Sequence, residues 1–198
     1  MKDIVDLDLK RTVSEYAMAF DLLAKVTHSI IEKDAIEKIL QICTTLFSPQ
    51  KLIYLSMKEN KPDQLYSLLS LTEEKDVTKT RLFSYKTSYG WTESEKGFQV
   101  QIRYNDKILG ILEVDDLICP EYKDHYLNLT ISMVDVYGLA IENATRYQRI
   151  KTAENKAKQE KTKLEKAMAE IKVLSGLLPI CSHCKKIRDD EGYWNSLE

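Results

Sequence analysis

The longest helical pattern in the chain runs from Glu121 to Leu178 and is interrupted by no proline and by only two glycines, Gly138 and Gly176. At 1.5 Å per residue, a helix of this length extends roughly 80 Å, which exceeds the width of a small domain. A single globular core cannot cover it from end to end. We therefore predict that its first part packs against a domain and that its second part is a connector.

Beyond Arg149, the apolar residues of this stretch recur at intervals of seven. They are Ile150, Ala157, Leu164, Ile171 and Leu178. Alanines and a leucine fill most of the second heptad position, and the flanking residues are mainly Lys, Glu and Gln. This pattern is typical of a two-stranded coiled coil, so 150–178 predicts a parallel homodimer joined through its terminal helices. A solvated single helix is the alternative.

Length and charge limit the class of protein. The chain has 198 residues, of which 43% are hydrophobic and 30% are charged, which is enough for one domain with a core and additional helix. A net charge of -2 gives no signal for a nucleic-acid partner. No apolar run approaches the roughly 20 residues that span a bilayer, and the N-terminus lacks a signal-peptide pattern. We expect a cytoplasmic protein with no membrane partner.

The order of the predicted elements indicates an α+β fold. Two amphipathic helices are predicted between Leu9 and Phe47, with Asp34 as the N-cap of the second. Cys43 lies on the apolar face of that second helix and is interpreted as a core residue. Strands are predicted at 51–57 and 64–71, with a weaker one at 80–86, and the segments 58–63, 73–79 and 88–97 are predicted loops.

The clearest hairpin joins 98–104 to 107–115 through the turn Asn105-Asp106. Its second strand is apolar on both sides. Ile108, Leu112 and Val114 lie on one side, and Leu109 and Ile111 on the other. A strand that is covered on both faces is central in its sheet. We therefore expect a central antiparallel sheet with the terminal helices on one face, followed by the long helix.

Two segments together resemble the C-terminal half of a GAF domain. They are the strand Ile-Leu-Gly-Ile-Leu-Glu-Val-Asp (108–115) and the helix end Gly-Leu-Ala-Ile-Glu-Asn-Ala-Thr-Arg-Tyr (138–147). The resemblance covers roughly 14–147. It implies a sensory and dimerisation module of signalling proteins, with a ligand pocket on the sheet face opposite the terminal helices. The chain lacks the Asn-Lys-Phe-Asp signature of cyclic-nucleotide binders, so the resemblance does not extend to that ligand.

Aromatic residues gather in the part of the sequence that would cover such a pocket. They are Tyr66, Phe83, Tyr85, Tyr89 and Trp91. They are candidates for the wall of a pocket that holds an unknown small molecule, and packing over the sheet is the alternative. Cys119 and His125 flank the start of the long helix and are candidates for a reactive thiol and a haem ligand.

The last segment contains Cys181 and Cys184 in a Cys-x-x-Cys pattern. Two cysteines at this spacing can hold one side of a tetrahedral zinc ion, but a structural site needs four ligands. The segment Cys-Lys-Lys-Ile-Arg-Asp-Asp-Glu-Gly-Tyr-Trp (184–194) resembles a C-terminal tail of bacterial and archaeal signalling proteins, which continues to a second cysteine pair. We interpret Cys181 and Cys184 as half of a zinc site in a truncated tail.

These observations predict four regions. An N-terminal tail (1–12) precedes a GAF-like sensory domain (13–149), a coiled-coil linker (150–178) and the cysteine tail (179–198). The expected function is non-enzymatic, because the chain has no Gly-rich phosphate loop, nucleophile elbow or kinase motif. The module would relay the binding of a ligand or partner through the coiled coil. A haem- or thiol-based redox sensor and a purely structural dimerisation module are the alternatives.

Overall fold

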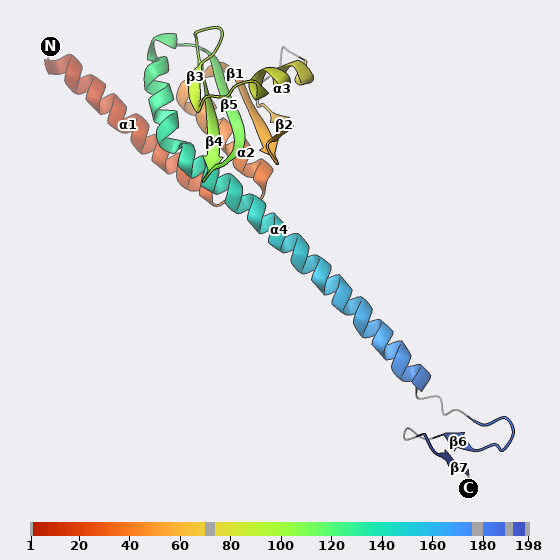
Figure 1. Ribbon diagram of the computed structural model, residues 1–198. Helices are drawn as coiled ribbons and strands as arrows, with labels where there is room; N and C mark the ends of the chain where they lie inside the picture. Colours follow the sequence, from red (N-terminus) through yellow and green to blue (C-terminus); the bar gives the residue numbers. More distant parts are fainter. Residues whose placement is uncertain (1, 70–73, 176–179, 189–191, 197–198) are drawn as a thin grey trace. The chain divides into compact units, whose positions relative to one another are not determined.

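The computed structural model describes residues 2–69, 74–175, 180–188 and 192–196, and the side chains from residue 13 to residue 171 and in the last two of these ranges. The chain divides into two compact units, 1–149 and 150–198. The first unit holds helices α1 (Lys2–Thr27), α2 (Glu32–Phe47) and α3 (Lys75–Phe83), the sheet, and the first part of α4 (Lys123–Ser175) (Figure 1). The predicted long helix is therefore confirmed.

A five-stranded antiparallel sheet forms the centre of the first unit. Its strands are β1 (Pro49–Lys58), β2 (Lys61–Tyr66), β3 (Tyr89–Trp91), β4 (Phe98–Tyr104) and β5 (Lys107–Leu117). They lie in the order β2-β1-β5-β4-β3, so β5 is the central strand, as its apolar faces predicted. The α+β class and the β4–β5 hairpin, with Asn105 at φ 51° in its turn, are also confirmed.

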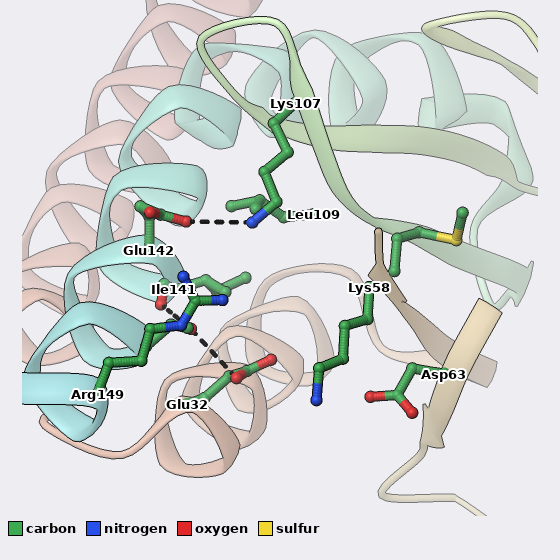
Figure 2. A pocket seen from close by; sticks show the side chains of 10 residues that line it. Glu32, Lys58, Asp63, Lys107, Leu109, Ile141, Glu142 and Arg149 are labelled. Atoms are coloured by element: carbon green, nitrogen blue, oxygen red, sulfur yellow. Dashed lines mark hydrogen bonds and ion pairs between the residues drawn. The ribbon is translucent and has the colours of Figure 1, made fainter. Parts of the chain in front are cut away.

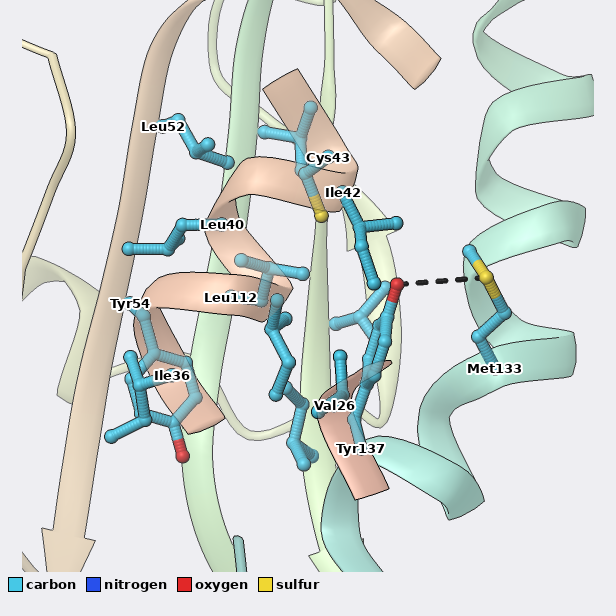
Figure 3. Packing of buried hydrophobic residues seen from close by; sticks show 14 of the residues in the cluster. Val26, Ile36, Leu40, Ile42, Cys43, Leu52, Tyr54, Leu112, Met133 and Tyr137 are labelled. Atoms are coloured by element: carbon cyan, nitrogen blue, oxygen red, sulfur yellow. Dashed lines mark hydrogen bonds between the residues drawn. The ribbon is translucent and has the colours of Figure 1, made fainter. Parts of the chain in front are cut away.

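The larger core lies between the sheet and the helices α1, α2 and α4. Leu52 and Tyr54 of β1, Phe98 of β4 and Leu112 of β5 point to this side and meet Ile36, Ile39 and Leu40 of α2. Figure 3 shows this packing, with Cys43, Met133 and Tyr137 in the same cluster. The interpretation of Cys43 as a core residue is confirmed, since its side chain is fully buried.

Leu109 lies on the opposite side of β5 from the one predicted. The alternation placed it with Ile111, but Leu109 belongs to the helix-side core and Ile111 to the smaller cluster on the other face. The cause is an irregular register, because Ile102 pairs with Gly110 whereas Arg103 pairs with Ile108. An extra residue at this point of β5 interrupts the two-residue alternation.

The second face of the sheet is covered by α3, where the sequence predicted a loop and a weak strand. Leu82 of α3 packs against Ile53, Leu55 and Ile111. Thr78 and Leu82 are four residues apart, which places both on the buried side of the helix. Asp76 in the first turn and Arg81 in the last turn complement the helix dipole. The strand prediction for 80–86 was wrong.

The β1–β2 hairpin is tighter than predicted. Its turn is Glu59-Asn60, and both residues have positive φ, as in a type I′ turn. The segment 61–66 is therefore a strand, although 58–63 was predicted as a loop and 64–71 as the strand. Pro62 is tolerated because β2 is an edge strand. In α2, Asp34 lies in the first turn, and Ile31 is the N-cap without a side-chain hydrogen bond.

Gly138 allows α4 to approach the sheet closely. A Cβ atom at this position would collide with the carbonyl oxygen of Arg103 at the end of β4. Ala140, Ile141 and Ala144 continue the buried side of the helix. This close contact fixes the part of α4 that belongs to the first unit.

In the second unit, every described side chain of α4 from Ile150 onward is exposed. A short hairpin follows, made of β6 (Ile187–Arg188) and β7 (Trp194–Asn195). Within the described part of the chain, none of the helices combines the length and the apolar character that crossing a bilayer requires.

Candidate functional site

The five aromatic candidates do not form one continuous wall. Tyr66 packs against the helix-side core, with its ring centroid 6.2 Å from that of Tyr54. Phe83, Tyr89 and Trp91 are exposed, and the Lys123 ammonium lies 4.9 Å from the Trp91 ring centroid. Tyr85 differs from these three exposed residues, because its hydroxyl is buried. It lies against Gly90 and has no hydrogen-bond partner among the described residues.

The sheet face beneath α3 instead holds a buried charge network that the sequence analysis did not identify. Glu113, in the middle of β5, is 0% exposed. Arg81 of α3 donates two hydrogen bonds to its carboxylate, with Nη1–Oε2 and Nη2–Oε1 distances of 2.5 and 2.8 Å. Lys51 Nζ lies 3.3 Å from Glu113 Oε1, and the Gln99 side-chain amide donates to Glu113 Oε2. The sequence signal was one acidic residue between Leu112 and Val114 in an apolar strand.

Further polar side chains extend this network along β4 and β5. Asp115 Oδ1 accepts hydrogen bonds from the hydroxyls of Thr92 (2.7 Å) and Ser94 (2.5 Å), which fixes the loop before β4. Gln101 Oε1 accepts from Arg103, and Gln101 Nε2 donates to the Tyr85 carbonyl at 3.3 Å. The face opposite the terminal helices therefore combines this polar network with the apolar cluster around Leu82, and α3 contributes Arg81 to the first and Leu82 to the second.

Cys119 and His125, the two candidates at the start of α4, have different surroundings. Cys119 is half-buried at the N-cap of a short 3-10 helix, Pro120–Tyr122, and makes no side-chain capping hydrogen bond. His125 Nε2 lies 2.6 Å from Glu15 Oε2 of α1, and its ring lies edge-on to that of Tyr16. The imidazole therefore joins α1 to α4.

Buried acidic groups in the helix-side core are held in their protonated form. Burial raises the pKa of the Cys43 thiol to about 12. Burial also raises the pKa of Tyr54 and the pKa of Tyr137. The Tyr137 hydroxyl donates a hydrogen bond to the Met133 sulfur at 3.5 Å. Cys43 is thus an inert thiol rather than a redox candidate.

Cys181 and Cys184 lie in a turn that brings backbone amides to a sulfur. The Cys184 amide nitrogen lies 3.5 Å from Cys181 Sγ, and hydrogen bonds from the Cys184 and His183 amides lower the pKa of the Cys181 thiol. The Cys181 amide donates to the Lys186 carbonyl and the Lys185 amide donates to the Cys181 carbonyl, which closes the turn. Among the described residues, no group of three or more His, Cys, Asp and Glu side chains is arranged to hold a metal ion.

The residues predicted to form the dimer seam are exposed on α4. Ile150, Leu164 and Ile171 are 59%, 62% and 63% exposed, and Ala157 is exposed as well. Leu178, the last predicted seam residue, lies outside the described residues. Within the described part of the chain, no side chain covers this row of large aliphatic residues, and a second helix covers such a row in a coiled coil.

A small pocket lies on the helix side of the first unit, where no site was predicted. It has a volume of about 140 Å³ and is formed by the start of α2, the β1–β2 hairpin, the start of β5 and α4 up to Arg149 (Figure 2). Ionic lining residues of both signs are present. They are Glu32, Lys58, Asp63, Lys107, Glu142 and Arg149. Sequence reasoning missed it because these residues come from five separate elements, α2, β1, β2, β5 and α4.

The chain matches no model of a known protein family, and no curated protein matches it at a significant level.

Proposed function

We propose that this chain is a non-enzymatic sensory and dimerisation module with a GAF-like domain, which acts in signal transduction by changing the arrangement of a dimeric coiled coil. The observation that carries the proposal is the row of exposed aliphatic residues Ile150, Leu164 and Ile171 on the helix that begins inside the domain. A second copy of the chain would cover this row, because these residues are separated by multiples of seven, which is the spacing of a coiled-coil seam.

The domain supports this proposal through the way α4 is attached to it. Gly138 places α4 against the end of β4, and Ile141 and Ala144 are buried in the core that α4 shares with the sheet. Any shift in the sheet or in α2 therefore changes the packing of α4. A ligand or partner that favours one such arrangement would shift the population of dimer states.

The cysteine tail is assigned a separate role as half of a zinc site. Cys181 and Cys184 offer two thiolates, and the backbone amides that face Cys181 favour its ionised form. Bound zinc would supply structural cross-linking only. The two thiolates need two further ligands, which a second cysteine pair would provide.

The test of the dimer is sedimentation velocity of the full chain at about tens of micromolar. The variant carrying Leu164→Asp and Ile171→Asp should shift from dimer to monomer, because two charges would enter the apolar seam. The matched control carries Thr162→Asp and Ala169→Asp, which introduce the same charges two residues earlier, on the far side of the helix. It should remain dimeric. A wild-type chain that sediments as a monomer would refute the proposal.

A further inference from the structure

Only some of the charged residues that line the small helix-side pocket are paired with other residues of the protein. Glu142 is held by Lys107, at an Nζ–Oε2 distance of 3.6 Å, and by Arg146, at an Nε–Oε1 distance of 2.8 Å. Glu32 Oε2 accepts a hydrogen bond from the Thr145 hydroxyl at 3.1 Å. These contacts fix the carboxylates that belong to α2 and α4.

Three other charged groups of the pocket have no such pairing. In the portion of the chain that the structure describes, Lys58, Asp63 and Arg149 form no ion pair within 4.0 Å. Lys58 and Asp63 come from the β1–β2 hairpin, and Arg149 from α4 (Figure 2). The pocket therefore presents two cationic groups and one carboxylate that are available to a bound molecule.

The rest of the lining is apolar, and the volume limits the ligand. Met57, Leu109 and Ile141 line the pocket, and the last two are almost fully buried. A volume of about 140 Å³ corresponds to roughly five water molecules. Sites for drug-sized ligands are typically about 300–1,000 Å³, so a nucleotide or a haem is too large.

The charged residues that line the pocket indicate whether its ligand is an anion, a cation or a zwitterion. The six ionic lining residues comprise three acids and three bases, so the pocket as a whole attracts neither a net anion nor a net cation. It does offer both signs separately, because the cations Lys58 and Arg149 are unpaired and the carboxylate of Asp63 is also unpaired. A molecule that carries an ammonium and a carboxylate satisfies both.

We propose that this pocket binds a small α-amino acid. Lys58 and Arg149 receive its carboxylate, Asp63 receives its ammonium group with Glu32 nearby, and Met57, Leu109 and Ile141 contact a short aliphatic side chain. Arg149 is the last residue of the first unit, directly before Ile150. Binding would hold Arg149 to the β1–β2 hairpin. The relay of this event to the coiled coil rests on the proposed function, whereas the binding itself does not.

The experiment is isothermal titration calorimetry of the full chain with glycine, L-alanine, L-serine, L-proline and L-valine, together with thermal melting in the presence of each. At least one should bind and raise the melting temperature. Arg149→Gln and Asp63→Asn should each weaken that binding at least tenfold. The matched controls Lys151→Gln and Asp135→Asn change exposed charges outside the pocket and should bind as the wild type does.

Acetate and ethylamine separate the two halves of the ligand. Each should bind far more weakly than the amino acid, because it satisfies one charge only. The proposal is overturned if no amino acid binds at millimolar concentration, if acetate binds equally well, or if the pocket variants bind unchanged. Sedimentation of the same samples reports the dimer independently, so the failure of the ligand and the failure of the dimer are distinguishable.

Discussion

The guanidinium of Arg81 and the carboxylate of Glu113 form a two-point ion pair across the face of the sheet, although the residues are 32 apart in the sequence. Two parallel N–H···O contacts fix the orientation of both groups. The pair joins α3 to the central strand, and it occupies the face where the GAF resemblance implied a ligand pocket.

Removal of Arg81 should destabilise the domain more than its partial exposure suggests. Arg81→Ala leaves the fully buried Glu113 with Lys51 as its remaining cation, and loss of one partner of a buried pair costs about 3–5 kcal/mol. We expect a loss of about 3 kcal/mol in the free energy of unfolding, measured by urea denaturation. Lys75→Ala, an exposed change in the same helix, is the control.

The double variant Arg81→Met with Glu113→Leu separates the pair from the packing of α3. It should recover part of the lost stability, because the fully buried carboxylate is gone and Lys51, which loses this partner, is partly exposed to solvent. If Arg81→Ala and Lys75→Ala unfold at the same urea concentration, the ion pair is not what holds α3 on the sheet.

Gly138→Ala should destabilise the chain even though alanine favours helix by about 1 kcal/mol. The added Cβ meets the backbone carbonyl of Arg103, which cannot rotate away as a side chain would. Overpacking of this kind costs about 1–3 kcal/mol, so the melting temperature should fall. Asn143→Ala, at an exposed position of the same helix, should leave the melting temperature unchanged or raise it slightly. A more stable Gly138→Ala protein would contradict the close contact.

The buried Cys43 thiol predicts a loss of stability at alkaline pH. Its pKa is about 12 in the folded chain and ordinarily 9.0. Between these values the unfolded chain releases the proton and the folded chain keeps it, so stability falls as pH rises above about 9. At pH 10 the loss from this group is about 1.4 kcal/mol.

Cys43→Ala isolates most of this contribution, because burial, rather than the contact with Cys43, is the main cause of the raised pKa of Tyr137. The variant should be less stable at pH 8 because of the cavity, but it should lose about 1.4 kcal/mol less than the wild type between pH 8 and pH 10. The measurement is the urea midpoint at both pH values. Equal losses in the two proteins would show that the thiol ionises freely in the folded chain.

The cysteine pair predicts weak zinc binding and an unusually reactive thiol. With two ligands of the four that zinc needs, the chain should lose the metal on extensive dialysis, as measured by metal content per chain. Half an equivalent, lost in Cys181→Ser, would instead indicate that two chains share one site. A full tightly held equivalent per chain would contradict the half-site.

Thiol labelling at neutral pH checks the state of the free pair. Cys181 should react readily, because hydrogen bonds from the Cys184 and His183 amides lower its pKa and so raise its thiolate fraction. Cys43 should not react until the chain unfolds.

Local patterns determined much of the architecture. The alternation in 98–104 and 107–115 predicted the hairpin and the central position of β5, because side chains on a strand alternate between two faces. The uninterrupted helical pattern after Pro120 predicted α4, and the apolar position of Cys43 predicted its burial. Each of these depends on neighbours within a few residues, which a sequence displays directly.

Tertiary contacts decided what local patterns could not. The segment 80–86 was predicted as a strand, but Leu82 and Arg81 are drawn into a helix by Ile111 and Glu113, which lie far along the chain. The irregular register of β5 moved Leu109 to the other face. The pocket joins Lys58, Asp63 and Arg149 from separate elements, and no spacing in the sequence marks them as neighbours. Sequence periodicity reports which face of an element is apolar, whereas the pairing of charges across elements exists only once the chain has folded.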